Sequence, residues 1–134
     1  VIVSHGAAAG VTCDLSDARL EAIAATGGLV GIHFYTSYLG PAPTPADVVA
    51  QVEYVARRVG VDHVALGVDF FPTEGAWRRL QEDQGTRQLR WAVSDMGQMP
   101  RVAAALDASG LCAADVDKVL GLNFLRVCRE VFGA

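Results

Sequence analysis

The stretch HVALGVDF, residues 63–70, decides the fold. It is apolar almost throughout, and its acidic side chain, Asp69, comes close to its end. Continuous apolar runs of this length are typical of strands that are covered on both faces, as in a parallel sheet flanked by helices or in a closed barrel. We therefore expect a buried strand here, with the Asp69 carboxylate near its carboxyl end.

Two further runs have the same character: VIVS, residues 1–4, and LVGIHFY, residues 29–35. Segments with a helical period, residues 15–25 and 45–59, separate the three runs. Short apolar strands that alternate with helices are typical of parallel strands joined by crossover helices. The predicted fold class is therefore α/β.

A long segment without a clear period follows Asp69. Residues 72–97 are polar, rich in arginine and interrupted by tryptophans. Segments of this length in compact domains are usually functional loops or disordered. We expect a loop or lid insertion over residues 72–97, followed by helices at about residues 100–108, 113–120 and 123–132, all within one unit that spans residues 1–134.

The composition is that of an ordinary globular protein. The 134 residues are 51% hydrophobic and 19% charged, and 15 acidic side chains outnumber 11 basic ones, for a net charge of -4. This balance argues against nucleic acid as a partner, and no apolar stretch approaches the length of a membrane span. A soluble protein of the bacterial cytoplasmic type is expected. Because the chain opens at Val1, we also expect it to be a fragment or a processed product.

The ends of the expected strands carry groups that can do chemistry. His5, Tyr35 and Asp69 lie at or near carboxyl ends, where parallel α/β proteins place their functional side chains. A neutral histidine can bind zinc, and an aspartate can bind a metal or accept a proton from water, so the pair indicates metal-assisted hydrolysis. Two structural interpretations stay open: a hydrogen-bonded histidine at a strand end, and a carboxylate that caps a helix or orders a loop.

The other histidines and the cysteines give weaker signals. His33 lies within a strand and is expected to be packed, or to support a ligand. His63 begins a strand, at the end opposite the functional one, so we expect it to have a structural role. The cysteines are odd in number and far apart, which fits neither a disulfide framework nor a zinc ribbon. They are at positions 13, 112 and 128.

Four segments together carry a resemblance to a known family. They are VIVSH, DLSDARLEAIAATGGLVGIHFY, TPADVVAQVEYVARRVGVDHVALGVDF and VLGLNFLRV, in this order. The series resembles the second half of the renal, or membrane, dipeptidases, a family of zinc peptidases. The similarity covers the serine-histidine after the sixth barrel strand, the entries to the seventh and eighth strands, and the closing helix that begins at an asparagine.

This resemblance implies a (β/α)8 TIM-type barrel of which the chain would form about strands 6 to 8 with their helices. It also implies two Zn2+ ions in the complete enzyme and a dipeptide, or a related small amide, as substrate. His5 would be a metal ligand, Asp69 the catalytic carboxylate that handles the water proton, and Tyr35 and Tyr38 would line the substrate pocket. The remaining ligands would come from earlier strands. The resemblance therefore implies at most a partial zinc site and an inactive isolated fragment, with a homo-oligomer as the complete form.

Two departures from the family pattern concern the substrate. Cys13 stands where an arginine commonly holds the substrate carboxylate, and Phe71 and Pro72 follow where the family has a second acid. One hypothesis is that an arginine of the 72–97 segment replaces the missing carboxylate clamp, since guanidinium groups bind carboxylates through paired hydrogen bonds. The alternative is a solvated charged loop or a subunit interface. The candidate arginines are Arg78, Arg79, Arg87 and Arg90.

Two other functions remain open at this point. The missing arginine and the altered acid loop are also compatible with a catalytically silent barrel homologue that serves as a binding or scaffold protein. A related enzyme acting on another amide, an ester or a lactone is the other alternative, because a fold and a metal pair constrain the reaction more than the substrate.

Overall fold

The structure is a computed structural model, and it describes residues 1–8, 14–70, 79 and 90–133. Its centre is a parallel sheet of three strands in the order β1-β2-β3. The strands are β1 (Ile2–Gly6), β2 (Leu29–Ile32) and β3 (Val64–Leu66). The predicted α/β class with parallel strands is confirmed.

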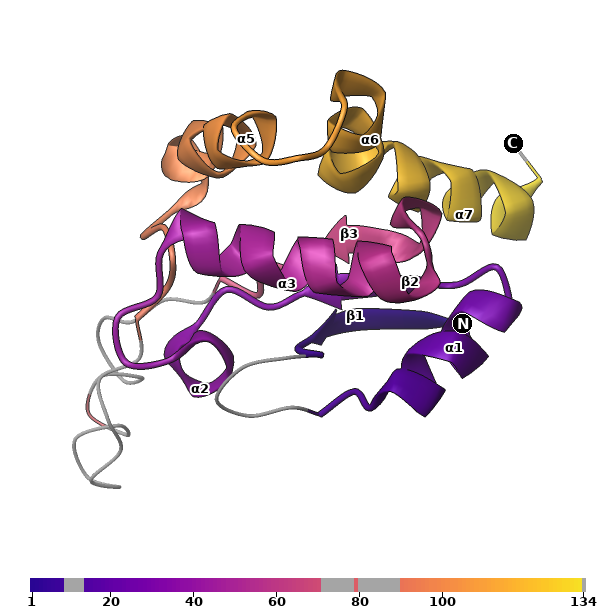
Figure 1. The fold of residues 1–134 in the computed structure, drawn as a ribbon, viewed down its shortest axis with the longest axis horizontal. Helices are drawn as coiled ribbons and strands as arrows, with labels where there is room; N and C mark the ends of the chain where they lie inside the picture. Colours follow the sequence, from indigo (N-terminus) through magenta and orange to yellow (C-terminus); the bar gives the residue numbers. More distant parts are fainter. Residues whose placement is uncertain (9–13, 71–78, 80–89, 134) are drawn as a thin grey trace.

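The two crossover helices form where capping residues start them. In α1 (Asp17–Ala25), the Ser16 side chain accepts a hydrogen bond from the Arg19 amide at 3.4 Å. In α3 (Pro45–Val59), the Thr44 amide donates to the Asp47 carboxylate at 2.8 Å, and proline occupies the start of the helix. Helix α3 lies across the sheet in Figure 1 and packs against α1 and against α5 (Met99–Asp107). Its buried residues are Val48, Val49, Gln51, Val52 and Val55.

The chain after β3 is helical at its end, as expected. A 3-10 turn, η2 (Met96–Gln98), leads into α5 (Met99–Asp107). Then α6 (Ala113–Asp117), the π-type turn η3 (Lys118–Leu122) and α7 (Asn123–Phe132) run on from one another. The break expected between the helices at about residues 113–120 and 123–132 is present as a kink at Gly121, which has a non-helical backbone inside the turn. Among the described residues, no helix is both long and apolar enough to cross a membrane.

Two strands are shorter than the sequence predicts. The run of residues 29–35 leaves the sheet after Ile32, because its next residues pair with residues 90–92. Phe34 accepts from the Ala92 amide at 2.8 Å, and Tyr35 and Trp91 form an antiparallel bridge. A short helix that the sequence did not predict, α2 (Thr36–Leu39), follows directly.

The third strand is shortened at both ends. His63 belongs to the 3-10 turn η1 (Val61–His63), and the strand hydrogen bonding stops soon after Leu66, where β2 also stops. The Gly67 amide still donates to the Ile32 carbonyl at 2.9 Å, so the chain leaves the sheet only beyond this point. The consequence is that Asp69 lies on an irregular segment just past the sheet.

Candidate active site at the carboxyl ends of the strands

Three side chains gather at the carboxyl ends of the strands. Potential ligand atoms of His5, His33 and Asp69 all lie within 4.8 Å of one another. The Asp69 Oδ2 is 3.3 Å from the His33 Nε2 and 3.9 Å from the His5 Nε2. The structure therefore brings together the two residues that the sequence singled out and adds His33 to them.

A bulge in β1 carries His5 toward β3, although β2 lies between these strands. The pairing of β1 with β2 shifts register between Val3 and Gly6. The backbone of the bulge passes against Gly31 and Gly67, and a β-carbon at either glycine would overlap the Ser4 carbonyl oxygen. The missing side chains at these positions thus make room for His5 to approach Asp69.

His5 is oriented by its neighbour in sequence. Its Nδ1 lies 2.9 Å from the Ser4 hydroxyl, and its side chain is 45% exposed. When Nδ1 carries the proton and donates to the Ser4 oxygen, Nε2 presents a lone pair toward Asp69. This tautomer is the one that binds a metal through Nε2, with Ser4 fixing the ring from the other side.

His33 has the opposite arrangement. Its side chain is 1% exposed, and its Nδ1 accepts a hydrogen bond from the Phe34 amide at 2.9 Å. Burial lowers the pKa of His33 from its ordinary value of 6.5 to about 4, and the nearby Asp69 carboxylate offsets only part of this effect. The ring is therefore neutral near pH 7, with its single proton on Nε2, and Nε2 faces the carboxylate.

Asp69 occupies a backbone conformation that few residues adopt. Its φ is 51°, in the left-handed region, and it is the one non-glycine residue with positive φ among the residues described. Aspartate tolerates this region better than most residues, and such conformations often occur at functional sites. Its side chain is 40% exposed, so the carboxylate is accessible to small molecules.

Aromatic rings form one wall of the site. The His33 ring lies 4.2 Å from the Tyr35 ring in an edge contact and 4.6 Å from the Tyr38 ring in a stacked one. Trp91 extends this wall, with its ring 6.1 Å from that of Tyr35 and 6.4 Å from that of Phe70. The sequence had placed Tyr35 and Tyr38 near the site, but the role of Trp91 was missed, because only the return of the chain after residue 89 brings it there.

The other predicted residues divide into two groups. Cys13, Arg78 and Arg87 lie outside the described residues, so their proposed part in substrate binding and the lid interpretation of residues 72–97 stay predictions. His63 lies at the opposite end of the sheet, where its Nδ1 is 2.8 Å from the Gly28 carbonyl oxygen. This contact agrees with the structural role expected for His63.

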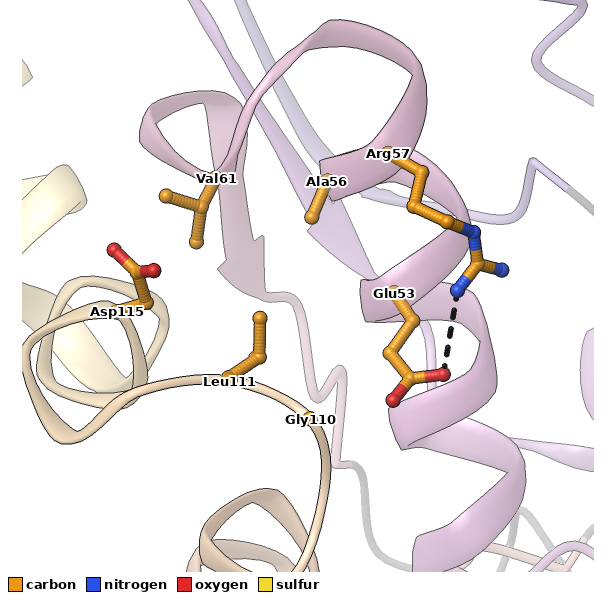
Figure 2. Close-up of a pocket in the computed structure, with 7 residues that line it drawn as sticks. All are labelled: Glu53, Ala56, Arg57, Val61, Gly110, Leu111 and Asp115. Carbon is orange, nitrogen blue, oxygen red and sulfur yellow. Dashed lines mark hydrogen bonds and ion pairs between the residues drawn. The ribbon is translucent and has the colours of Figure 1, made fainter.

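A separate groove lies between α3 and the connection from α5 to α6 (Figure 2), with a volume of about 380 Å³. It is distant from the strand ends, and its charged groups have partners: Glu53 lies 3.4 Å from Arg57, and Asp115 lies 3.2 Å from Lys118. Nothing in the groove offers convergent polar groups for a ligand, unlike the cluster at the strand ends. Its lining residues are Glu53, Ala56, Arg57, Val61, Gly110, Leu111 and Asp115.

Known proteins resemble this chain over nearly its whole length. A Klebsiella pneumoniae protein described as an uncharacterized protein in the pqqA 5' region is 34% identical over 125 residues, which cover 89% of this chain and 41% of that protein. Dipeptidase ataJ of Aspergillus terreus is 28% identical over 138 residues, which cover 98% of this chain and 30% of that protein. The chain thus spans less than half the length of these relatives.

Solved structures of similar proteins superpose on this chain. An amidohydrolase from Pseudomonas aeruginosa superposes with a TM-score of 0.86 at 30% identity, covering 100% of this chain and 46% of that one. A metallo peptidase from Rhodobacter sphaeroides, liganded with a phosphinate mimic of the dipeptide L-Ala-D-Ala, superposes with a TM-score of 0.70 at 25% identity, covering 92% of this chain and 34% of that one. A sequence profile of the membrane dipeptidases, peptidase family M19, matches residues 1–133. The chain therefore belongs to the membrane dipeptidase family.

Proposed function

We propose that the complete protein is a metal-dependent dipeptidase and that this chain contributes part of its active site. The observation that carries the proposal is the convergence of His5 and Asp69 at the strand ends, with 3.9 Å between the His5 Nε2 and the Asp69 Oδ2, in a member of a dipeptidase family. A histidine and a carboxylate at this separation suit the hydrolysis of an amide by water.

The residues present fit one protein ligand of a zinc site. The exposed His5 ring, with its Nδ1 beside the Ser4 hydroxyl, can present Nε2 to a metal. A catalytic zinc site needs about three protein ligands, and the pair of Zn2+ ions that we propose needs more, so the others must come from further parts of the protein. When bound, such a pair would lower the pKa of a water molecule and polarise the substrate carbonyl.

Asp69 and the tyrosines have distinct roles in this proposal. Asp69 accepts a proton from the attacking water and delivers it to the amine that leaves, which is general base and then general acid catalysis. Tyr35 and Tyr38 line the pocket beside the carboxylate and contact the substrate. The substrate class is a dipeptide or a related small amide, which is supported by the relative that is a dipeptidase and by the related structure that holds a dipeptide mimic.

We further propose that the chain forms about strands 6 to 8 of a (β/α)8 barrel, with the complete protein a homo-oligomer. Apolar side chains at the start of β1 and on the last helix support the barrel, because Ile2, Leu125 and Phe132 are exposed here. A closed barrel and its outer helices would cover such residues. A crystal structure of the complete protein would test both points.

The full-length protein, loaded with zinc, should release free amino acids from dipeptides. His5→Ala should reduce both bound zinc and activity, whereas Asp69→Asn should retain zinc and lose activity. His63→Asn is the matched control, since asparagine can keep the contact to the Gly28 carbonyl, and it should behave as the wild type. Zinc that binds undiminished to His5→Ala would contradict the ligand role.

The substrate class needs a panel of compounds. The same protein should be tested on dipeptides and on simple amides, esters and lactones, because the Pseudomonas aeruginosa structure is described only as an amidohydrolase. Turnover of an ester or lactone in preference to every dipeptide would replace the proposed substrate. The absence of turnover on the whole panel, with zinc bound, would favour a catalytically silent homologue.

A further inference from the structure

His33 is the most deeply buried polar side chain of the site, yet it is not placed to act as a metal ligand. The Phe34 amide donates to its Nδ1 at 2.9 Å, which occupies that nitrogen as an acceptor. A neutral ring then carries its proton on Nε2. To bind a metal through Nε2, the ring would have to move this proton to Nδ1, where it would meet the N–H of Phe34.

Asp69 is the acceptor that this proton faces. The His33 Nε2 lies 3.3 Å from the Asp69 Oδ2, closer than the His5 Nε2 at 3.9 Å. Among the described residues, these two histidines are the ones within 4.0 Å of the carboxylate as possible ion-pair partners. Asp69 itself lies just past the sheet with a φ of 51°, and its side chain is 40% exposed, so packing surrounds only part of the carboxylate.

The His33 ring, in contrast, is held from several sides. Tyr38 stacks on it with ring centres 4.6 Å apart, Tyr35 contacts its edge at 4.2 Å, and the His5 ring meets it at 5.1 Å in a T-shaped contact. A donor held in this way can define the position of an acceptor beside it. With Nδ1 held as an acceptor by the Phe34 amide, the donor that the ring can offer the carboxylate is Nε2–H.

We propose that His33 is a positioning residue for Asp69: its Nε2–H donates to Oδ2 and holds the carboxylate in the orientation that proton transfer requires. This proposal rests on the function proposed above. It assigns to His33 a task in the reaction that is distinct from metal binding, although His33, His5 and Asp69 together resemble a three-ligand metal site.

Two variants isolate the donor. His33→Phe keeps a ring but removes both nitrogens, whereas His33→Gln restores an N–H near the position of Nε2. Both variants lose the acceptor for the Phe34 amide, so the structural cost of that lost hydrogen bond is common to them. The difference between them reports the hydrogen bond to Asp69.

In the zinc-loaded full-length protein, His33→Phe should lower kcat for a dipeptide about 10- to 100-fold, the usual effect of removing a residue that orients a reacting group. KM should change little, and His33→Gln should recover most of the lost kcat. In an Asp69→Asn background, His33→Phe should cause almost no further loss, because His33 acts through the carboxylate. An equal loss in both backgrounds, or no recovery with glutamine, would overturn the proposal.

Two measurements remain informative even if the protein proves to have no dipeptidase activity. Bound zinc should be the same in the wild type, His33→Phe and His33→Gln, and a loss of zinc in both variants would show that His33 is a ligand instead. In crystal structures, the Asp69 carboxylate should shift or occupy several positions in His33→Phe and return to its place in His33→Gln. An unmoved carboxylate in His33→Phe would contradict the positioning role.

Discussion

Gly67 lies against the backbone of His5: a β-carbon on Gly67 would stand 2.9 Å from the His5 α-carbon and would overlap the carbonyl oxygen of Ser4. These residues are far apart in the sequence, and β2 separates their strands. The bulge in β1 crosses toward β3 at this point, so the distance from His5 to Asp69 depends on a glycine that takes no part in the chemistry.

Gly67→Ala should therefore disturb the site, although Gly67 is not one of its reacting residues. The added methyl group pushes against the Ser4–His5 backbone, and overpacking of this kind costs about 1–3 kcal/mol of stability. Because His5 moves away from Asp69, we expect weaker zinc binding and lower activity in the full-length protein. Zinc titration and the thermal unfolding midpoint measure the two effects.

Gly110→Ala is the matched control for this change. Its β-carbon would meet no atom within 4 Å, and its backbone does not require glycine. Stability and zinc affinity should stay close to those of the wild type. If Gly67→Ala were as well tolerated as Gly110→Ala, the account of the bulge would be wrong.

The last helix is attached to the sheet by a buried amide. The Asn123 side chain donates to the Val61 carbonyl at 2.7 Å and to the Val64 carbonyl at 2.9 Å. Asn123→Ala leaves both carbonyls without this donor, and each buried group left unsatisfied costs about 1–3 kcal/mol. The free energy of unfolding, from urea denaturation, should fall by at least this amount.

Arg129→Ala is the control on the same helix, since Arg129 is exposed. It should change the free energy of unfolding by less than about 0.5 kcal/mol, as is usual for surface substitutions. Equal stability of the two variants would mean that Asn123 does not anchor the helix.

The sequence predicted the elements better than the contacts between them. Strands and crossover helices have periods and caps that neighbouring residues determine, as the Thr44–Asp47 pair at the start of α3 illustrates. The ends of strands depend on partners that lie elsewhere in the chain. Thus the run of residues 29–35 stopped pairing at Ile32, because Phe34 pairs with Ala92, and no local pattern contains this information.

In the candidate site, too, the sequence predicted the positions of residues along the strands better than the contacts between their side chains. His5 and Asp69 could be placed at strand ends from the sequence, because the topology of parallel strands fixes where those ends meet. The contact of His33 with Asp69 could not, since alternation alone leaves the orientation of a histidine at the end of a strand undetermined. The bulge of β1 could not be predicted from the sequence either. The one feature of the sequence that relates to it is the pair of glycines at positions 31 and 67, which leave room for the Ser4 carbonyl.

An ion pair links the turn before β3 to the C-terminal helices. Lys118 lies 2.9 Å from the Asp62 carboxylate, and its hydrogen bond lowers the pKa of Asp62 below the ordinary value of 3.8. The folded state then holds the proton less tightly than the unfolded state. This stabilisation is present above pH 3.8 and is lost as the pH falls through and below that value.

Asp62→Asn should therefore lower the unfolding midpoint at pH 6, and its effect should shrink as the pH falls below 3.8 and the wild-type carboxyl gains its proton. Asp62 is exposed and Lys118 is partly exposed, so the effect at pH 6 is small and should weaken further with added salt. Asp107→Asn, at another exposed carboxyl, is the control and should show no such change with pH. A deficit in Asp62→Asn that is independent of pH would exclude the ion pair as its cause.

Tyr38 connects the wall of the site to His33, because its ring stacks on the imidazole at an interplanar angle of 24°. Burial raises the pKa of Tyr38, so its hydroxyl stays protonated throughout the neutral range. Tyr38→Ala removes the ring that we propose contacts the substrate, and since an aromatic contact contributes about 0.5–1.5 kcal/mol, we expect KM for a dipeptide to rise about two- to tenfold in the full-length protein. Tyr38→Phe keeps the ring and should stay near the wild type if stacking and packing are what matter. A KM that rises equally in both variants would instead assign the substrate contact to the hydroxyl group, and an unchanged KM in Tyr38→Ala would remove Tyr38 from the pocket.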